Sequence, residues 1–191
     1  MTLWLARHAQ VIAAPGLCYG ALELASDSAA TQAAATQLAA VLPAGVAVRC
    51  SPRQRCRDLA AALGALRADL PAPLEDTRLA EMDFGQWEGQ LWSHIGKDAV
   101  DAWTADFWAH RFGGRQSVQE FMAGVEAAWQ EQVALAGDAV WITHAGVIRA
   151  CSLLQQGKRG PLQSHEWVGP EVPMGQVLRM DLPPPPVGGA N

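Results

Sequence analysis

The sequence predicts an α/β protein of three layers, α/β/α, built on a mostly parallel central sheet. Three short apolar runs, at residues 2–6, 46–50 and 138–143, have the length and composition of buried strands. Helical patterns follow these runs, and strands that alternate with helices favour parallel pairing with helices on both faces. A last strand is expected at residues 175–182.

Four helices are expected to cover this sheet. Asp27 and Ser28 can cap an Ala-rich helix that stops at Pro43, and Ser117 and Glu120 have the Ser-x-x-Glu spacing of a capping box. The other two are expected from the spacing of their apolar residues. The helices are therefore predicted at residues 28–42, 53–70, 117–136 and 147–156.

The chain is predicted to form a single domain over residues 1–182, which is large enough for one hydrophobic core. Residues 81–114 interrupt the alternating pattern and are expected to form a small cap, with helical segments of high aromatic content at 91–112. The Pro- and Gly-rich residues 183–191 are expected to be a disordered tail.

Composition excludes several classes of partner. A net charge of −5 over 191 residues offers no footprint for nucleic acid or for an anionic membrane, and no apolar run is long enough to cross one. No secretory signal is visible, and four scattered cysteines are expected to be reduced, so the predicted location is the cytoplasm. These cysteines are Cys18, Cys50, Cys56 and Cys151.

Two histidines are placed at predicted strand ends: His8 follows the first strand and His144 the strand at 138–143. Ligands of parallel sheets bind beyond the carboxyl ends of the strands, so one crevice can hold both imidazoles. A neutral imidazole is a good nucleophile toward phosphorus, and Arg7 would neutralise phosphoryl oxygens that otherwise repel attack. The pair therefore indicates an anion site.

A second feature supports an anion at this edge of the sheet. Arg53, Arg55 and Arg57 crowd the first turn of the predicted second helix, where cations are unfavourable against the helix dipole. A docked anion would reverse that cost. One inward-pointing arginine is enough for this interpretation, and the others can be solvated.

An acid is also available. Glu81 lies in a polar turn and could protonate a leaving oxygen and then activate water, with Asp83 an equal rival on spacing alone. His144, protonated or as a hydrogen-bond donor, could stabilise the transferring group.

Four blocks together resemble the ordered signatures of the histidine phosphatase superfamily, which has the phosphoglycerate-mutase-like fold. They follow the order of that family and span most of the chain. The blocks are Arg7-His8-Ala9, Ser51-Pro52-Arg53-Gln54-Arg55-Cys56, residues 78–89 with the string Phe84-Gly85-Gln86-Trp87-Glu88-Gly89, and Thr143-His144-Ala145-Gly146-Val147-Ile148-Arg149.

The resemblance implies a role for each matching position. His8 would be phosphorylated on its ring nitrogen, Arg7, Arg55 and His144 would hold the phosphoryl group, and Glu81 would be the proton donor. The family uses no metal or other cofactor, and none is expected here. The chain departs from the family at Ala9 and Gln10, where Gly and an acidic residue are usual, and in its middle block at Gly113 to Ser117. These departures bear on substrate contacts more than on phosphoryl transfer.

The expected activity is hydrolysis of a small phosphomonoester through a phosphohistidine, since this short chain lacks the closing segments that a mutase needs. The loop Cys18-Tyr19-Gly20 and residues 81–89 are similar to α-ribazole-5′-phosphate phosphatases of cobalamin biosynthesis. Tyr19, Gly20 and Trp87 are then substrate-binding candidates. A phosphoglycerate mutase and a non-catalytic phospho-ligand-binding module remain the alternatives, and the oligomeric state stays open.

The remaining cap aromatics could stack on a flat substrate or pack the cap. Trp103 with Phe107, and Trp108 with Phe112, have the i,i+4 spacing of packed helical pairs. Arg149 belongs to the last block but follows His144 by more than a helical turn, so a structural ion pair is expected for it. Weaker substrate candidates are Arg111 and Arg115, whereas His94, His110 and His165 match no catalytic block.

Overall fold

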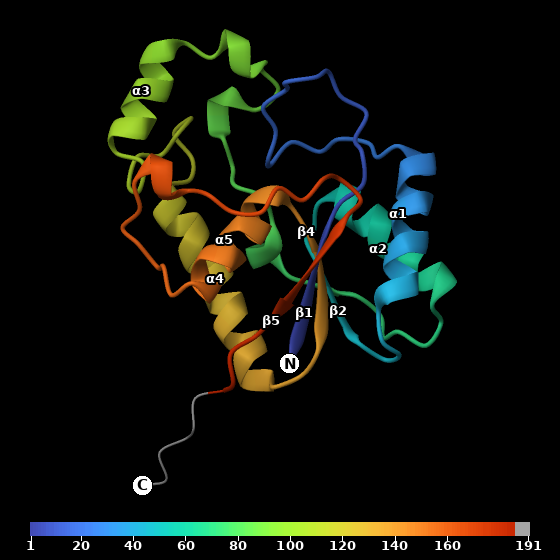
Figure 1. Ribbon diagram of the computed structural model, residues 1–191. Helices are drawn as coiled ribbons and strands as arrows, with labels where there is room; N and C mark the ends of the chain where they lie inside the picture. Colours follow the sequence, from blue (N-terminus) through green and yellow to red (C-terminus); the bar gives the residue numbers. More distant parts are fainter. Residues whose placement is uncertain (186–191) are drawn as a thin grey trace, which may run out of the picture.

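A computed structural model, which describes residues 1–185, confirms the α/β fold with a mostly parallel sheet (Figure 1). The sheet of the described residues has the strand order β3-β2-β4-β1-β5, in which β5 alone is antiparallel to its neighbour. Parallel β1 and β4 are central, so both bury their two faces. The strands are β1 (Thr2–Arg7), β2 (Ala47–Cys50), β3 (Leu74–Glu75), β4 (Ala139–Thr143) and β5 (Val177–Asp181).

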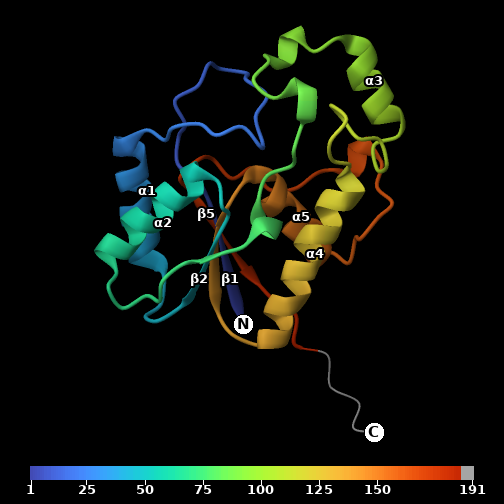
Figure 2. The same ribbon diagram turned by 180° about the vertical axis from the view of Figure 1, so that it is seen from behind.

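Two pairs of helices cover the sheet, one pair on each face, and together they make the three layers (Figures 1 and 2). The predicted caps are present: the Asp27 side chain accepts from the Ala30 N–H, and Ser117 and Glu120 form the capping box. The helices are α1 (Ser28–Val41), α2 (Gln54–Leu66), α3 (Lys97–Ala105), α4 (Val118–Leu135) and α5 (Ala145–Gln155).

The strands distribute their side chains between two cores. Leu3 and Leu5 of β1 pack with α4 and α5, whereas Trp4 and Ala6 pack with α1 and α2. Trp141 of β4 is fully buried in the first core. Successive side chains of a strand point to opposite faces, so a continuous apolar run is what a strand covered on both faces requires.

Helix α2 is shorter than predicted because Arg67 ends it. The Arg67 guanidinium donates to the carbonyl oxygens of Ala39 and Leu42, at 2.8 and 2.9 Å, and pairs with Asp69 at 2.7 Å. These bonds satisfy the end of α1 and draw the chain away from the helical path. The following β3 was not predicted, since its two residues are exposed and carry no pattern.

The expected cap at 81–114 is less helical than predicted. Only α3 is an α-helix there, with 3-10 turns at Gly85–Trp87 and Trp92–His94. Trp103 stacks on Phe112 with ring centroids 4.4 Å apart. Nine residues along a continuous helix would place these rings on opposite sides and about 13 Å apart along the axis, so the helix must end between them.

The last strand lies within the predicted range. Of the tail predicted to be disordered at 183–191, residues 186–191 lie outside the described part, and residues 183–185 form no helix or strand. Within residues 1–185, no helix is both long and apolar enough to cross a membrane.

Candidate active site

The carboxyl ends of three parallel strands meet at one point of the sheet edge. His8 follows β1, Ser51 follows β2 and His144 follows β4, as the sequence predicts. The His8 N–H donates to the Thr143 carbonyl at 2.9 Å, and the rings of His8 and His144 lie 5.2 Å apart between centroids. Strand order therefore brings together residues 136 positions apart.

The tautomer of His8 is fixed by the backbone. Its Nδ1 lies 2.8 Å from the carbonyl oxygen of Ala9. A carbonyl can only accept, so Nδ1 carries the proton and Nε2 is left with a free lone pair. Burial, with the charges of Arg55 and Arg7 nearby, lowers the pKa of His8 to about 3, so the ring is neutral. Its Nε2 lone pair is therefore available at ordinary pH.

His144 is also a neutral ring. Its Nε2 lies 2.8 Å from the Ser51 hydroxyl, whereas its Nδ1 is buried without a partner. Burial, followed by the Arg55 charge, lowers its pKa well below the usual value. The sequence left two forms of His144 open, a protonated ring or a neutral hydrogen-bond donor, and this low pKa favours the neutral donor. The sequence placed Ser51 at a strand end but did not predict its hydrogen bond with His144.

Arg55 is the inward-pointing arginine of the predicted basic turn. It is fully buried, and its two Nη atoms donate to the carbonyls of Gly20 and Leu22 at 2.7 and 2.9 Å. Burial lowers its pKa, but a guanidinium stays charged in proteins. Among the described residues, no carboxylate lies within 4 Å of the Arg55 guanidinium, so no ion pair neutralises its charge. Tyr19 contributes the face of its ring, 5.2 Å from the guanidinium carbon.

Arg7 and Glu81 complete the set. Arg7 donates from Nη1 to the Val172 carbonyl at 2.9 Å, and its buried Nε has no partner. The Glu81 carboxyl accepts from the N–H groups of Gly146 and Met82 at 3.0 and 3.1 Å. Burial outweighs these bonds and raises the pKa of Glu81, which favours the protonated form that a general acid needs.

Gly146 has a steric reason to be glycine that sequence analysis missed. A Cβ at this position would lie 2.1 Å from a carboxyl oxygen of Glu81. The glycine therefore lets the first turn of α5 approach Glu81 closely enough for its N–H to fix that carboxyl.

One cavity of about 160 Å³ joins these side chains. It contains all five predicted catalytic residues, together with Tyr19. Three apolar residues form the rest of its wall. Leu17 and Phe84 were not predicted as contacts, whereas Trp92 is one of the cap aromatics for which stacking and packing were both open. The lining residues are Arg7, His8, Leu17, Tyr19, Arg55, Glu81, Phe84, Trp92 and His144.

Two of the predicted substrate contacts have other positions. Gly20 does not line the cavity; its carbonyl holds Arg55, and its N–H is held by Glu88. Trp87 is also outside the cavity, since its ring packs on Phe112 at 5.9 Å between centroids. Trp92 occupies the aromatic place expected of Trp87.

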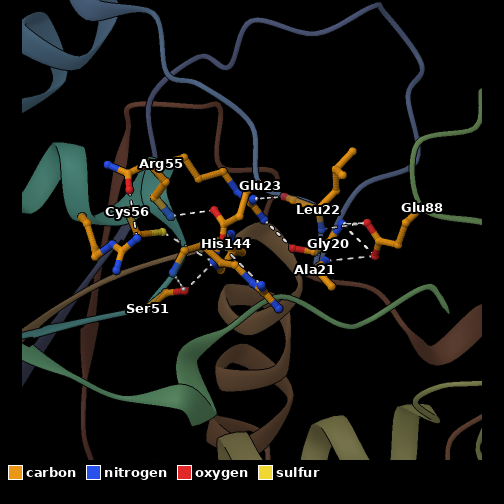
Figure 3. A network of polar contacts seen from close by, with 12 residues as sticks. Gly20, Ala21, Leu22, Glu23, Ser51, Arg55, Cys56, Glu88 and His144 are labelled. Atoms are coloured by element: carbon orange, nitrogen blue, oxygen red, sulfur yellow. Dashed lines mark hydrogen bonds and ion pairs between the residues drawn. The ribbon is translucent and has the colours of Figure 1, made fainter.

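Glu88 is an anchor that the sequence did not identify. Its carboxylate accepts from the N–H groups of Gly20, Ala21 and Leu22 at 2.9–3.1 Å (Figure 3). It also accepts from the Phe84 N–H at 2.9 Å. The same loop supplies the carbonyls that hold Arg55. Glu88 therefore fixes the loop that positions Arg55, and its neighbour Trp87 packs within the cap.

The other charged candidates are engaged elsewhere. Arg53 pairs with Glu23 at 3.3 Å, and Arg57 donates to Gln54 at 2.9 Å. Asp83, the rival of Glu81, accepts from the Gly85 N–H and lies 3.6 Å from Arg115. Arg111 pairs with Glu120. None of Arg53, Arg57, Asp83, Arg111 and Arg115 lines the cavity.

The fold and this site define a class: an α/β protein with two neutral histidines, two arginines and a protonatable carboxyl around one small cavity. Residues 3–165 match the histidine phosphatase superfamily (branch 1). The chain therefore belongs to this superfamily, as its sequence blocks predict. Membership supports catalysis of the phosphatase or mutase type.

Solved structures agree with this assignment. TTHB049 from Thermus thermophilus is 29% identical, with a TM-score of 0.70 over 96% of this chain and 95% of that chain. Mycobacterial hydrolase 2 is 25% identical, with a TM-score of 0.75 over 93% and 80%. The open reading frame Rv3214 from Mycobacterium tuberculosis, at 23% identity and a TM-score of 0.67 over 83% and 81%, shows the same fold. No curated protein matches significantly.

Proposed function

We propose that this protein is a phosphatase that hydrolyses a small phosphomonoester through a phosphohistidine, with no metal ion. The observation that carries the proposal is the bond from His8 Nδ1 to the Ala9 carbonyl, because it leaves Nε2 free to attack. The acceptor is a backbone group, so the unusual side chain at position 9 does not disturb it.

The first step forms a bond from His8 Nε2 to phosphorus and breaks the bond from phosphorus to the ester oxygen. Arg7 and Arg55 neutralise the phosphoryl oxygens, and the unpartnered Nδ1 of His144 is available to donate to one of them. Glu81 gives its proton to the leaving oxygen, which departs as the alcohol.

The second step reverses these roles. The ionised Glu81 takes a proton from water, the water oxygen attacks phosphorus, and the bond to Nε2 breaks. Inorganic phosphate leaves, Nε2 recovers its lone pair and Glu81 is protonated again.

As the natural substrate we propose α-ribazole 5′-phosphate. The similarity of residues 18–20 and 81–89 to that branch supports this choice, as do the rings of Phe84 and Trp92 in the wall of the cavity. A flat base can stack on such rings.

The test is release of inorganic phosphate from phenyl phosphate and α-ribazole 5′-phosphate by the wild type and by His8→Ala. We expect His8→Ala to abolish release from both, and the wild type to form an acid-labile phosphoenzyme. Full activity in His8→Ala would refute the mechanism. Rapid conversion of 3-phosphoglycerate to 2-phosphoglycerate, with a trace of the bisphosphate, would indicate a mutase instead. Release from phenyl phosphate alone would refute the substrate.

A further inference from the structure

A second cavity, of about 240 Å³, adjoins the one that contains His8. The two share the side chains of Glu81, Phe84 and Trp92, so Glu81 lies on the boundary between them. Aromatic rings dominate the second cavity. Its lining residues are Glu81, Met82, Phe84, Trp92, Trp103, Val118, Phe121, Ala145, Gly146, Arg149 and Trp167.

Three separate parts of the chain build this wall. Trp103 comes from α3 in the cap and Phe121 from α4, and Trp167 follows the 3-10 turn Ser164–Glu166. The rings of Phe121 and Trp167 lie 6.3 Å apart between centroids. The wall is thus formed by side chains far apart in the sequence.

Two residues that line the second cavity carry hydrogen-bond donors without partners. The Trp103 Nε1 and the Arg149 Nε are both buried and unpaired in the described residues. The ion pair expected for Arg149 is absent there: no carboxylate of residues 1–185 lies within 4 Å of its guanidinium, because the segment 169–173 packs beside it. A buried unpaired donor costs free energy until an acceptor arrives.

The position of Glu81 decides which half of a substrate belongs here. In the proposed reaction Glu81 protonates the leaving oxygen, so the alcohol must extend from Glu81 away from His8. The second cavity begins at that point. Its rings suit a planar apolar body, and Arg149, which also lines it, suits an acceptor on that body.

We propose that the second cavity binds the leaving group, and that it selects phosphomonoesters whose alcohol carries a planar aromatic ring with a hydrogen-bond acceptor that Arg149 meets. This inference rests on the proposed phosphatase function. α-Ribazole 5′-phosphate, whose base has a ring nitrogen as acceptor, is one member of this class.

The experiment compares kcat/KM for phenyl phosphate and 3-carboxyphenyl phosphate, whose leaving phenols have similar acidity. We expect the wild type to prefer the carboxylated ester about tenfold. Arg149→Met, which keeps the apolar stem, should reduce that preference to about one, and Arg149→Lys should restore part of it. Arg179→Met is the matched control, since Arg179 is an exposed arginine of β5, and should keep the wild-type preference.

Binding of the product 3-hydroxybenzoate supplies a second measurement, because Trp92, Trp103 and Trp167 line the cavity and their fluorescence should be quenched. Arg149→Met should raise the dissociation constant of 3-hydroxybenzoate, measured by this quenching, about tenfold. Equal kcat/KM for the two esters, or a preference unchanged in Arg149→Met, would overturn the inference and leave the phosphatase standing. Failure of the wild type to release phosphate from either ester would refute the proposed function and this inference with it.

Discussion

Replacing Glu88 by Gln tests how the position of Arg55 is maintained. The Glu88 carboxylate receives four backbone N–H groups, and Gly20 approaches both of its oxygens, at 3.1 and 2.9 Å. An amide keeps one oxygen but replaces the other by an NH₂ group, which cannot accept. If the NH₂ group takes the Oε2 position, only the Leu22 N–H loses its acceptor, whereas the opposite orientation leaves Ala21 and Phe84 unpaired.

The favoured orientation therefore leaves one donor unsatisfied. Such a loss costs about 1–3 kcal/mol, and the bonds that remain are weaker because the negative charge is gone. The Leu22 carbonyl also accepts from Arg55 Nη1, so a displaced Leu22 moves the guanidinium. We expect Glu88→Gln to lose about 1–3 kcal/mol of unfolding free energy and to lower kcat/KM at least tenfold. Most of that loss should be a higher KM for the phosphate ester, because Arg55 holds the phosphoryl group less well.

Urea unfolding followed by tryptophan fluorescence gives the first quantity, and phosphate release from phenyl phosphate gives the second. Glu126→Gln is the matched control, because Glu126 of α4 forms an exposed ion pair with Arg159 at 2.7 Å. We expect this variant to change the unfolding free energy by no more than about 0.5 kcal/mol and to leave kcat/KM unaltered. A Glu88→Gln variant with wild-type unfolding and wild-type kcat/KM would show that the loop does not depend on this carboxylate.

Two other predictions concern Gly146 and His8. Gly146→Ala should displace the Glu81 carboxyl and lower kcat for phenyl phosphate about tenfold or more, but lower it less for 4-nitrophenyl phosphate, whose leaving group needs less protonation. Gly124→Ala on α4, where a Cβ meets open space, is the control, and equal losses of kcat on both esters would contradict the acid role of Glu81. The pKa of His8 falls from 6.5 to about 3 on folding, so below about pH 6.5 the unfolded chain binds a proton that the folded chain does not, and the unfolding free energy should decline as the pH falls from 6.5 toward 3. Urea unfolding at pH 5 and pH 7 should show a smaller difference for His8→Asn than for the wild type, and an unchanged difference would mean that His8 is not buried as a neutral ring.

The sequence predicted what depends on strands and their ends. His8 and His144 follow apolar runs long enough to identify, and parallel topology then places both at one edge. Helical spacing alone leaves Arg53, Arg55 and Arg57 open, because the inward one depends on the rotation of α2 against the loop at Gly20. The family resemblance singles out Arg55, and the structure places that side chain inward.

The sequence did not predict what depends on contacts between loops. Glu88 acts on residues 66–68 positions earlier, and no periodicity connects them. Trp167 lies in a segment without helix or strand pattern, so its place in the second cavity follows from the tertiary structure. The sequence favours Trp87 over Trp92 as a substrate contact, whereas the tertiary structure packs Trp87 on Phe112 and places Trp92 in the cavity wall.

The bond from Arg7 to the Val172 carbonyl has a consequence for substrate affinity. Arg7 faces the cavity of His8, and Val172 lies five residues after Trp167, which lines the second cavity. The stretch 170–173 also lies beside Arg149, the other arginine of that second cavity. Free-energy coupling between two sites is reciprocal. If an alcohol moiety orders this stretch, it strengthens phosphoryl binding through Arg7, and a bound phosphoryl group favours the alcohol by the same factor. The two halves of an ester would then bind more tightly joined than their separate affinities suggest, and each product would loosen the hold on the other as it leaves.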